Sequence, residues 1–164
     1  MIFAYIFIGI VIAERLIELK IAAKNESWMK SHGGFEVGKG HYKLFIIMHV
    51  AFFSSLMVEL QYISVVFHIS LFILFMLVQL CRIWCMLSLG RFWNTKIIVL
   101  PSVAVIKTGP YKYMKHPNYV IVFAELFLLP ALFGAFWTAS LFPLLHMSLL
   151  SIRIPLEDKA LGRN

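Results

Sequence analysis

Five long apolar stretches decide what this chain can fold into, because each is long enough, or nearly so, to cross a lipid bilayer. A membrane-spanning helix needs about 20 mainly apolar residues. Hydrophobic residues make up 61% of the 164-residue chain and charged residues only 14%, whereas soluble domains are about 45–50% apolar and about 25% charged. The sequence therefore predicts an all-α, polytopic membrane protein with about five transmembrane helices, at residues 2–22, 44–60, 65–89, 117–132 and 136–152.

Only residues 133–135 separate the last two apolar stretches. A connection this short places two helices antiparallel and side by side, so we expect them to form a tight hairpin. No stretch between the spanning candidates is long enough for a separate soluble domain. We therefore interpret residues 1–164 as a single membrane domain.

The distribution of basic residues predicts which ends of the helices face the cytoplasm. Twelve of the fifteen Lys and Arg residues fall in or beside the 25–42 segment, in the 90–116 segment and in the C-terminal tail. By the positive-inside rule, the N-terminus lies outside, and both long loops and the C-terminus lie in the cytoplasm. This topology explains the net charge of +7 without nucleic acid, and it predicts that anionic membrane lipids are favoured at this face. The twelve are Lys24, Lys30, Lys39, Lys43, Arg91, Lys96, Lys107, Lys112, Lys115, Arg153, Lys159 and Arg163.

Ionisable residues inside spanning stretches are costly, so they are usually paired or functional. Glu14, Arg15 and Glu18 share one face of the first helix because they are three or four residues apart. Arg82 and Glu125 lie within the third and fourth stretches. Two interpretations remain open: these groups pair with one another and fix helix packing, or they line a cavity that takes a polar head group.

Other chemically active residues carry weaker signals. We interpret His49, His68 and His146, each isolated in an apolar stretch, as packing residues. Cys81 and Cys85 lie four apart on one predicted helix, and we expect two free thiols. No acids or histidines have zinc-ligand spacing, so no metal site is predicted.

The polar and aromatic segment "GPYKYMKHPNYV" at residues 109–120 stands out between apolar stretches. Proline is favoured at the first position of a helix, so Pro117 predicts a helix start with His116 just outside it. The free N–H groups of a helix N-terminus favour an anion such as a carboxylate. The alternative is a belt of Tyr and Lys at the membrane interface, which does not require this order of residues.

A second polar pair, Arg153 and Glu157, follows the last apolar stretch. Residues four apart share a helix face if the helix continues, although Pro155 weakens that inference. The hairpin is expected to bring this pair close to His116. An Arg can hold a carboxylate through two parallel hydrogen bonds; the alternative is a surface ion pair, which contributes little.

The C-terminal half, roughly residues 103–162, resembles the isoprenylcysteine carboxyl methyltransferase family of membrane enzymes, through "TGPYKYMKHPNYV", an apolar hairpin and "RIPLEDKALG". The resemblance implies S-adenosylmethionine (S-adenosyl-L-methionine) as methyl donor, with residues 101–164 binding it. Residues 1–100 would then supply three helices and a cytoplasmic loop, and the helices would form a lipid tunnel. Arg153 and Glu157 are implied as catalytic residues, with Arg153 holding the acceptor's anionic head. The implied cofactor contacts are Val103, Ala104, Val105, Ile106, Tyr111, His116, Pro117, Asn118, Tyr119 and Glu157.

Two positions depart from the family's pattern. Lys115 stands where relatives commonly have Arg, which keeps the charge but not the planar fork. Ile121 stands where relatives often have Gly. The N-terminal half, with "ERLIELKIAAKNESWMKSHGGFEVG", resembles a short bacterial branch linked with methylation of long-chain polyketides such as alkylpyrones.

The resemblance implies an O-methyltransferase of the bacterial cell membrane, acting on a lipid-like acid or acidic enol. Such an acceptor ionises readily, so the enzyme mainly has to align two reactants and exclude water. Two other functions remain open. One is a non-enzymatic membrane subunit or small transporter, and the other is a membrane reductase that shares the C-terminal architecture.

Overall fold

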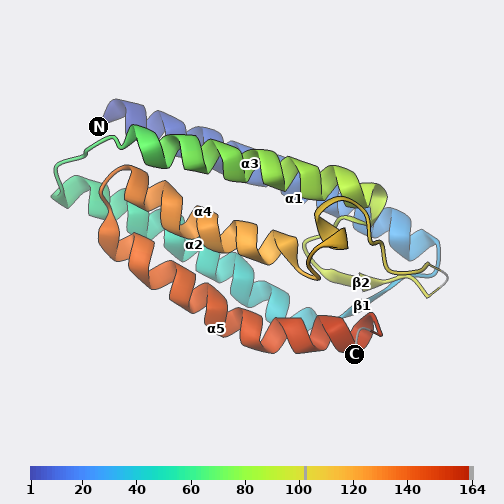
Figure 1. Ribbon diagram of the computed structural model, residues 1–164. Coiled ribbons are helices and arrows are strands. Elements are labelled where there is room, and N and C mark those ends of the chain that lie inside the picture. Colours follow the sequence, from blue (N-terminus) through green and yellow to red (C-terminus); the bar gives the residue numbers. More distant parts are fainter. Residues whose placement is uncertain (102, 163–164) are drawn as a thin grey trace.

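The computed structural model describes residues 1–101 and 103–162, and within them the chain forms five α-helices that run lengthwise beside one another (Figure 1). The predicted all-α architecture is confirmed. Arg163, one of the twelve basic residues above, lies outside the described residues. The helices are α1 (Ile2–Ser31), α2 (Lys39–Tyr62), α3 (Ile69–Leu89), α4 (Pro117–Leu132) and α5 (Phe136–Ala160).

The composition of these helices is that of a membrane protein. Three helical segments in the described part of the chain are long and apolar enough to cross a bilayer: Lys39–Tyr62, Ile69–Phe92 and Phe136–Ala160. α4 is apolar but has 16 residues, and α1 has 30 residues with charged side chains in its middle. Large apolar side chains are exposed along the outer helix faces. Contact of such a large apolar surface with water would be unfavourable, whereas lipid tails would cover it without that cost.

Helix ends differ from the predicted bounds where polar residues follow an apolar stretch. α1 continues beyond residue 22 to Ser31, and α5 continues beyond residue 152 to Ala160. Pro155 lies inside α5 without ending it. Hydropathy reports the length of the apolar span, whereas a helix continues into water as long as its backbone hydrogen bonds are made. α2 likewise begins at Lys39 rather than at residue 44.

At one end of the bundle, which we call the turn end, two short connections pair with each other. The predicted hairpin of α4 and α5 is observed, and its turn packs beside the α2–α3 connection (Figure 1). The backbone N–H groups of Val66 and His68 donate to the carbonyls of Phe133 and Leu132. This pairing holds the chain extended after residue 63, so α3 begins at Ile69 rather than at residue 65.

Glu59 stabilises the start of α5 at the turn end. Its carboxylate accepts hydrogen bonds from the backbone N–H groups of Trp137 (3.0 Å) and Thr138 (2.8 Å) and from the Thr138 hydroxyl (2.6 Å). These are N–H groups that a helix cannot satisfy by itself, and a negative charge is favoured beside them. A charged residue near the membrane boundary thus has a structural role.

At the opposite end, which we call the sheet end, two short strands pair antiparallel: β1 (Phe35–Val37) and β2 (Ile97–Val99). The glycine-rich composition of residues 31–40 favours a flexible loop, yet Phe35–Val37 is an ordered strand. Gly38 connects β1 to α2 with φ of 68°, and a Cβ there would lie 2.4 Å from Leu156 of α5. This contact ties the sheet to the extended end of α5.

Two 3-10 turns complete the sheet end: η1 (Gly90–Phe92) and η2 (Gly109–Lys112). η2 packs on α3 so closely that a Cβ on Gly109 would lie 2.0 Å from the Ser88 hydroxyl. Gly109 also has φ of +55°, which glycine adopts at little cost. The segment that leads to α4 is therefore held against α3 instead of being free in solvent.

Candidate functional site

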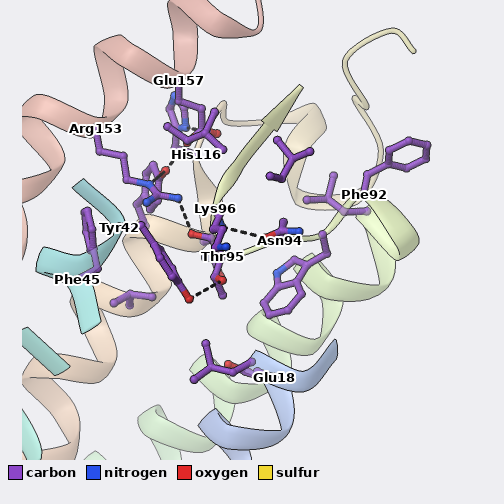
Figure 2. Close-up of a pocket in the computed structure, with 18 of the residues that line it drawn as sticks. Glu18, Tyr42, Phe45, Phe92, Asn94, Thr95, Lys96, His116, Arg153 and Glu157 are labelled. Atoms are coloured by element: carbon purple, nitrogen blue, oxygen red, sulfur yellow. Dashed lines mark hydrogen bonds and ion pairs between the residues drawn. The ribbon is translucent and has the colours of Figure 1, made fainter. Parts of the chain in front are cut away.

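A cavity of about 660 Å³ lies inside the sheet end. That volume is within the usual range for small-molecule sites. Figure 2 shows His116, Arg153 and Glu157 gathered at one end of it and Glu18 at the other. Its walls come from α1, α2, α3, α4 and α5, from β2, and from residues 100, 101 and 103–106. Residues from nearly the whole length of the chain therefore meet here.

The N-terminus of α4 supplies one wall of the cavity. Pro117 is the first helical residue, and its neighbour His116 is the N-cap with non-helical backbone geometry. Tyr119 then lies in the first turn with its hydroxyl toward α5, where it donates a hydrogen bond to Glu157 and accepts one from Arg153 Nε (2.7 Å). The predicted meeting of this helix start with Arg153 and Glu157 is thus observed.

Arg153 is a buried cation whose hydrogen-bond partners among the described residues are all neutral. It is 7% exposed and lies on the cavity wall. Its guanidinium donates to the Tyr119 hydroxyl and to the backbone carbonyl of Thr95 (2.7 Å), and it lies 4.9 Å from the centre of the Phe45 ring. It does not form the surface ion pair with Glu157 that the sequence left open, because the Tyr119 hydroxyl lies between them. A buried charge whose direct hydrogen-bond partners are all neutral favours an anionic ligand.

His116 lies between two carboxylates of α5. Its Nε2 is 3.0 Å from Asp158 and its Nδ1 is 3.6 Å from Glu157, and its ring stacks on Tyr119 with 5.3 Å between ring centroids. The hydrogen bond to Glu157 and the negative charges of Glu157 and Asp158 raise the pKa of His116, although partial burial opposes the shift. The protonated ring is therefore favoured in the folded protein.

Most of the predicted cofactor contacts meet at this cavity. The 103–106 segment lines it together with Tyr111, His116, Asn118, Tyr119 and Glu157. Pro117 is buried at the start of α4 and is not among the described lining residues. The roles of these residues remain predictions. Lys115, one of the two departures from the family's pattern, also lines the cavity.

The sequence did not reveal the segment that holds Arg153 in place. Residues 93–96 are anchored to α1 by Asn25, whose side-chain amide donates to the carbonyl of Trp93 (2.8 Å), and by Lys96, which pairs with Glu26 (2.9 Å). Thr95 then presents its carbonyl to Arg153 and its hydroxyl to Tyr42 of α2 (3.2 Å) (Figure 2). Of these residues the sequence singles out only Lys96, as one of the basic residues that indicate the cytoplasmic side.

The ionisable residues of α1, α3 and α4 form a buried network at the inner end of the cavity. Arg82 donates to both oxygens of Glu18 (2.6 Å each) and to Glu125 (2.7 Å). Arg15 pairs with Glu14 (3.2 Å), Glu18 (3.0 Å) and Glu125 (3.4 Å). The interpretation that these groups pair with one another is confirmed. Arg15, Glu18 and Arg82 also line the cavity, so the network forms its polar floor.

The fold and this site define the class of the protein. An all-α bundle with an apolar outer surface contains a cavity whose lining includes a cluster of polar side chains and many apolar ones. It is a polytopic membrane protein with an internal cavity of the size of a small-molecule site. Within the described residues, no three His, Cys, Asp or Glu side chains are grouped as a metal site requires.

The family follows from comparison with known proteins. The sequence profile of the isoprenylcysteine carboxyl methyltransferase (ICMT) family matches residues 70–163, and the chain belongs to this family. The family consists of membrane-bound methyltransferases. The matched region contains η2, α4 and the polar end of α5, and it begins after α1 and α2.

Two relatives from bacteria match almost the whole chain. The protein YpbQ of Bacillus subtilis (strain 168), described as uncharacterized, is 42% identical over 160 residues, which cover 96% of this chain and 95% of the relative. An uncharacterized protein of Haemophilus influenzae is 28% identical over 167 residues, covering 99% of this chain and 96% of the relative. No solved structure shows a significant match.

Proposed function

We propose that this protein is an S-adenosylmethionine-dependent O-methyltransferase of the bacterial cell membrane, and that its acceptor is a lipid-like carboxylic acid or acidic enol. A long-chain alkylpyrone or an isoprenylcysteine-like acid would fit this description. One observation carries the proposal: Arg153 is a buried cation on the cavity wall, and its hydrogen-bond partners are neutral oxygens. An anionic oxygen of the acceptor would supply the missing negative charge.

The residues at the α4 N-terminus fit the donor molecule. Asn118 Oδ1 is a buried acceptor atom with no partner among the described residues, on the wall of the same cavity. An amine of S-adenosylmethionine would satisfy it. Glu157 offers a carboxylate to ribose hydroxyls or an amine, and the helix N-terminus favours the donor's carboxylate. Tyr111 and the 103–106 segment would lie along the rest of the molecule.

The acceptor's tail fits the apolar part of the cavity. Leu16 and Leu19 of α1 line it, together with Ile46, Val50 and Phe53 of α2. Burying an alkyl chain contributes about 0.8 kcal/mol per methylene. A long hydrocarbon tail would thus supply binding energy while Arg153 holds the head group.

The chain's own residues then have to position the reactants. S-adenosylmethionine, when bound, supplies a methyl group on a sulfonium, which an anionic oxygen can accept directly by in-line displacement. Arg153 would orient that oxygen, and Tyr119 would keep the Arg153 guanidinium turned toward it. Surrounding apolar residues would exclude water. Glu157 would bind the cofactor's ribose hydroxyls or amine. Through its hydrogen bond with Tyr119, it would also help to orient Arg153.

Charge and the bacterial relatives support the proposed location. The basic residues gather at the sheet end and in the segments that flank it, and the positive-inside rule places such segments in the cytoplasm. The cavity would then face the compartment that holds S-adenosylmethionine, with the N-terminus outside. Anionic lipids of the inner leaflet would be favoured around this end.

The first experiment measures cofactor binding and methyl transfer by the purified protein in detergent. We expect calorimetry to show S-adenosylmethionine binding to the wild type. Arg153→Ala should lower kcat/KM for the acceptor about a hundredfold, because it removes a charge-assisted contact of about 2–3 kcal/mol. Lys159→Ala, an exposed cation on the same helix, is the control and should match the wild type. Absence of binding in both calorimetry and photolabelling would refute the proposal.

The second experiment identifies the acceptor. Lipids from cells with and without the protein are compared by mass spectrometry, and we expect species that differ by one methyl group. Isotope-labelled methionine should place its label in that methyl group. If no lipid gains a methyl group from labelled methionine in cells that produce folded protein, the proposed acceptor class is wrong.

A further inference from the structure

α5 presents a second polar point to the cavity, deeper in the bundle than Arg153. His146, Arg153 and Glu157 all line the cavity from this one helix. His146 lies seven residues, or two helical turns, before Arg153, which places it about 10 Å nearer the turn end at 1.5 Å per residue. An elongated ligand held by Arg153 would therefore pass His146.

His146 is buried, yet its imidazole lacks a hydrogen-bond partner at one nitrogen. The residue is 1% exposed, and its Nδ1 has no partner among the described residues. Buried polar atoms are nearly always hydrogen-bonded, and one that is not carries a free-energy cost. The expectation that His146 is an ordinary packing histidine does not explain this atom. A group inside the cavity would satisfy it.

The surroundings of His146 indicate which kind of group would fit. Phe45 meets its ring edge-on at 6.1 Å, so this side is apolar. His49 of α2 lines the same cavity. The Nδ1 of His49 donates to the Phe45 carbonyl (2.8 Å), because a carbonyl can only accept, and a neutral His49 then offers Nε2 as an acceptor. A hydroxyl, which both donates and accepts, matches this pair, and a carbonyl matches His146 alone.

We propose that His146 is a second recognition point for the acceptor, which hydrogen-bonds a hydroxyl or carbonyl carried on the acceptor's chain about 10 Å from the oxygen held by Arg153. This inference rests on the proposed function, because it places the acceptor in this cavity. It narrows the acceptor class from lipid-like acids in general to those with an additional oxygen on the chain. An unsubstituted hydrocarbon tail would leave His146 unpaired.

The test uses octadecanoic acid and a series of its monohydroxy derivatives, with the hydroxyl at successive positions along the chain. Binding to the full-length protein in detergent is measured by competition with a fluorescent fatty acid. We expect the wild type to prefer hydroxyls within a narrow range of positions by about three- to tenfold, as one buried hydrogen bond allows. His146→Phe should lose the preference while its affinity for octadecanoic acid stays within about twofold of wild type, since it removes no other bond.

Controls separate this inference from a folding defect and from the proposed function. Ser148→Ala, an exposed position on the same helix, should keep the preference. A wild-type protein that binds all the monohydroxy acids equally would overturn the inference. A folded His146→Phe variant that keeps the preference for certain hydroxyl positions would also overturn it. Either result means that water alone satisfies His146. If the wild type shows the preference but neither binds S-adenosylmethionine nor transfers a methyl group, the proposed function fails and the recognition role stands.

Discussion

Replacing Arg82 by methionine should destabilise the bundle more than most single substitutions can. Arg82 is 6% exposed and makes three short hydrogen bonds, two to Glu18 and one to Glu125. Methionine has a similar length but no charge, so the substitution leaves two buried carboxylates that have lost a shared cation. Because α1, α3 and α4 each contribute one of these three residues, the loss would weaken the attachment of all three helices.

The expected magnitude follows from the partners that remain. Removing one member of a buried ion pair typically costs about 3–5 kcal/mol. Arg15 still lies 3.0 Å from Glu18 and 3.4 Å from Glu125, so part of the negative charge stays compensated. We therefore expect a loss of about 4 kcal/mol in the free energy of unfolding for Arg82→Met.

Equilibrium unfolding in detergent, followed by circular dichroism, measures this loss. Arg91→Met is the matched control because Arg91 is exposed and its guanidinium lies over the Trp28 ring (5.4 Å), a contact of about 1 kcal/mol or less. The double variant Arg82→Met with Glu18→Gln should recover about 1–3 kcal/mol, since it removes one of the stranded charges. If Arg82→Met were no less stable than Arg91→Met, the network would not stabilise the bundle as argued.

Three further predictions concern the cavity. Tyr119→Phe should lower kcat/KM for the acceptor about thirtyfold, equivalent to about 2 kcal/mol, because Arg153 loses a hydrogen bond. The control Tyr113→Phe, at an exposed position, should match wild type. An unchanged kcat/KM for Tyr119→Phe would contradict the role of Tyr119 in orienting Arg153. Asn25→Ala should raise the acceptor KM about tenfold while the affinity for S-adenosylmethionine stays unchanged, because it loosens residues 93–96, which hold Arg153. Lys24→Ala is the control. Equal acceptor KM values for the two variants would refute the positioning role of Asn25. Because the pKa of His116 is raised in the folded protein, its protonated ring contributes stability that is fully present below pH 6.5 and is lost as pH rises through the raised pKa. Thermal unfolding should show this loss of stability in the wild type and not in His116→Gln. Parallel pH profiles of the melting temperature for the two proteins would contradict the prediction.

Local patterns predicted some elements closely and others poorly. α4 has the bounds that the sequence predicted, because Pro117 favours a helix start and the 133–135 turn follows its apolar stretch at once. The strands β1 and β2 were missed because they are short and about sixty residues apart along the chain. Their pairing depends on how α1 and α3 place the two segments, and no local periodicity records that.

The candidate site divides in the same way. The sequence alone determined that the chain is a membrane protein and that His116 and Tyr119 lie at a helix start. It placed Arg153 and Glu157 on one helix face only if the helix continued through Pro155. Helix period, proline geometry and hydropathy are properties of contiguous residues, so they can be read from the chain. Only the tertiary structure decided that Tyr119 lies between Arg153 and Glu157, which leaves the arginine with neutral hydrogen-bond partners. It also decided which acids the buried arginines pair with, because such partners come from segments far apart in sequence and depend on how the helices pack.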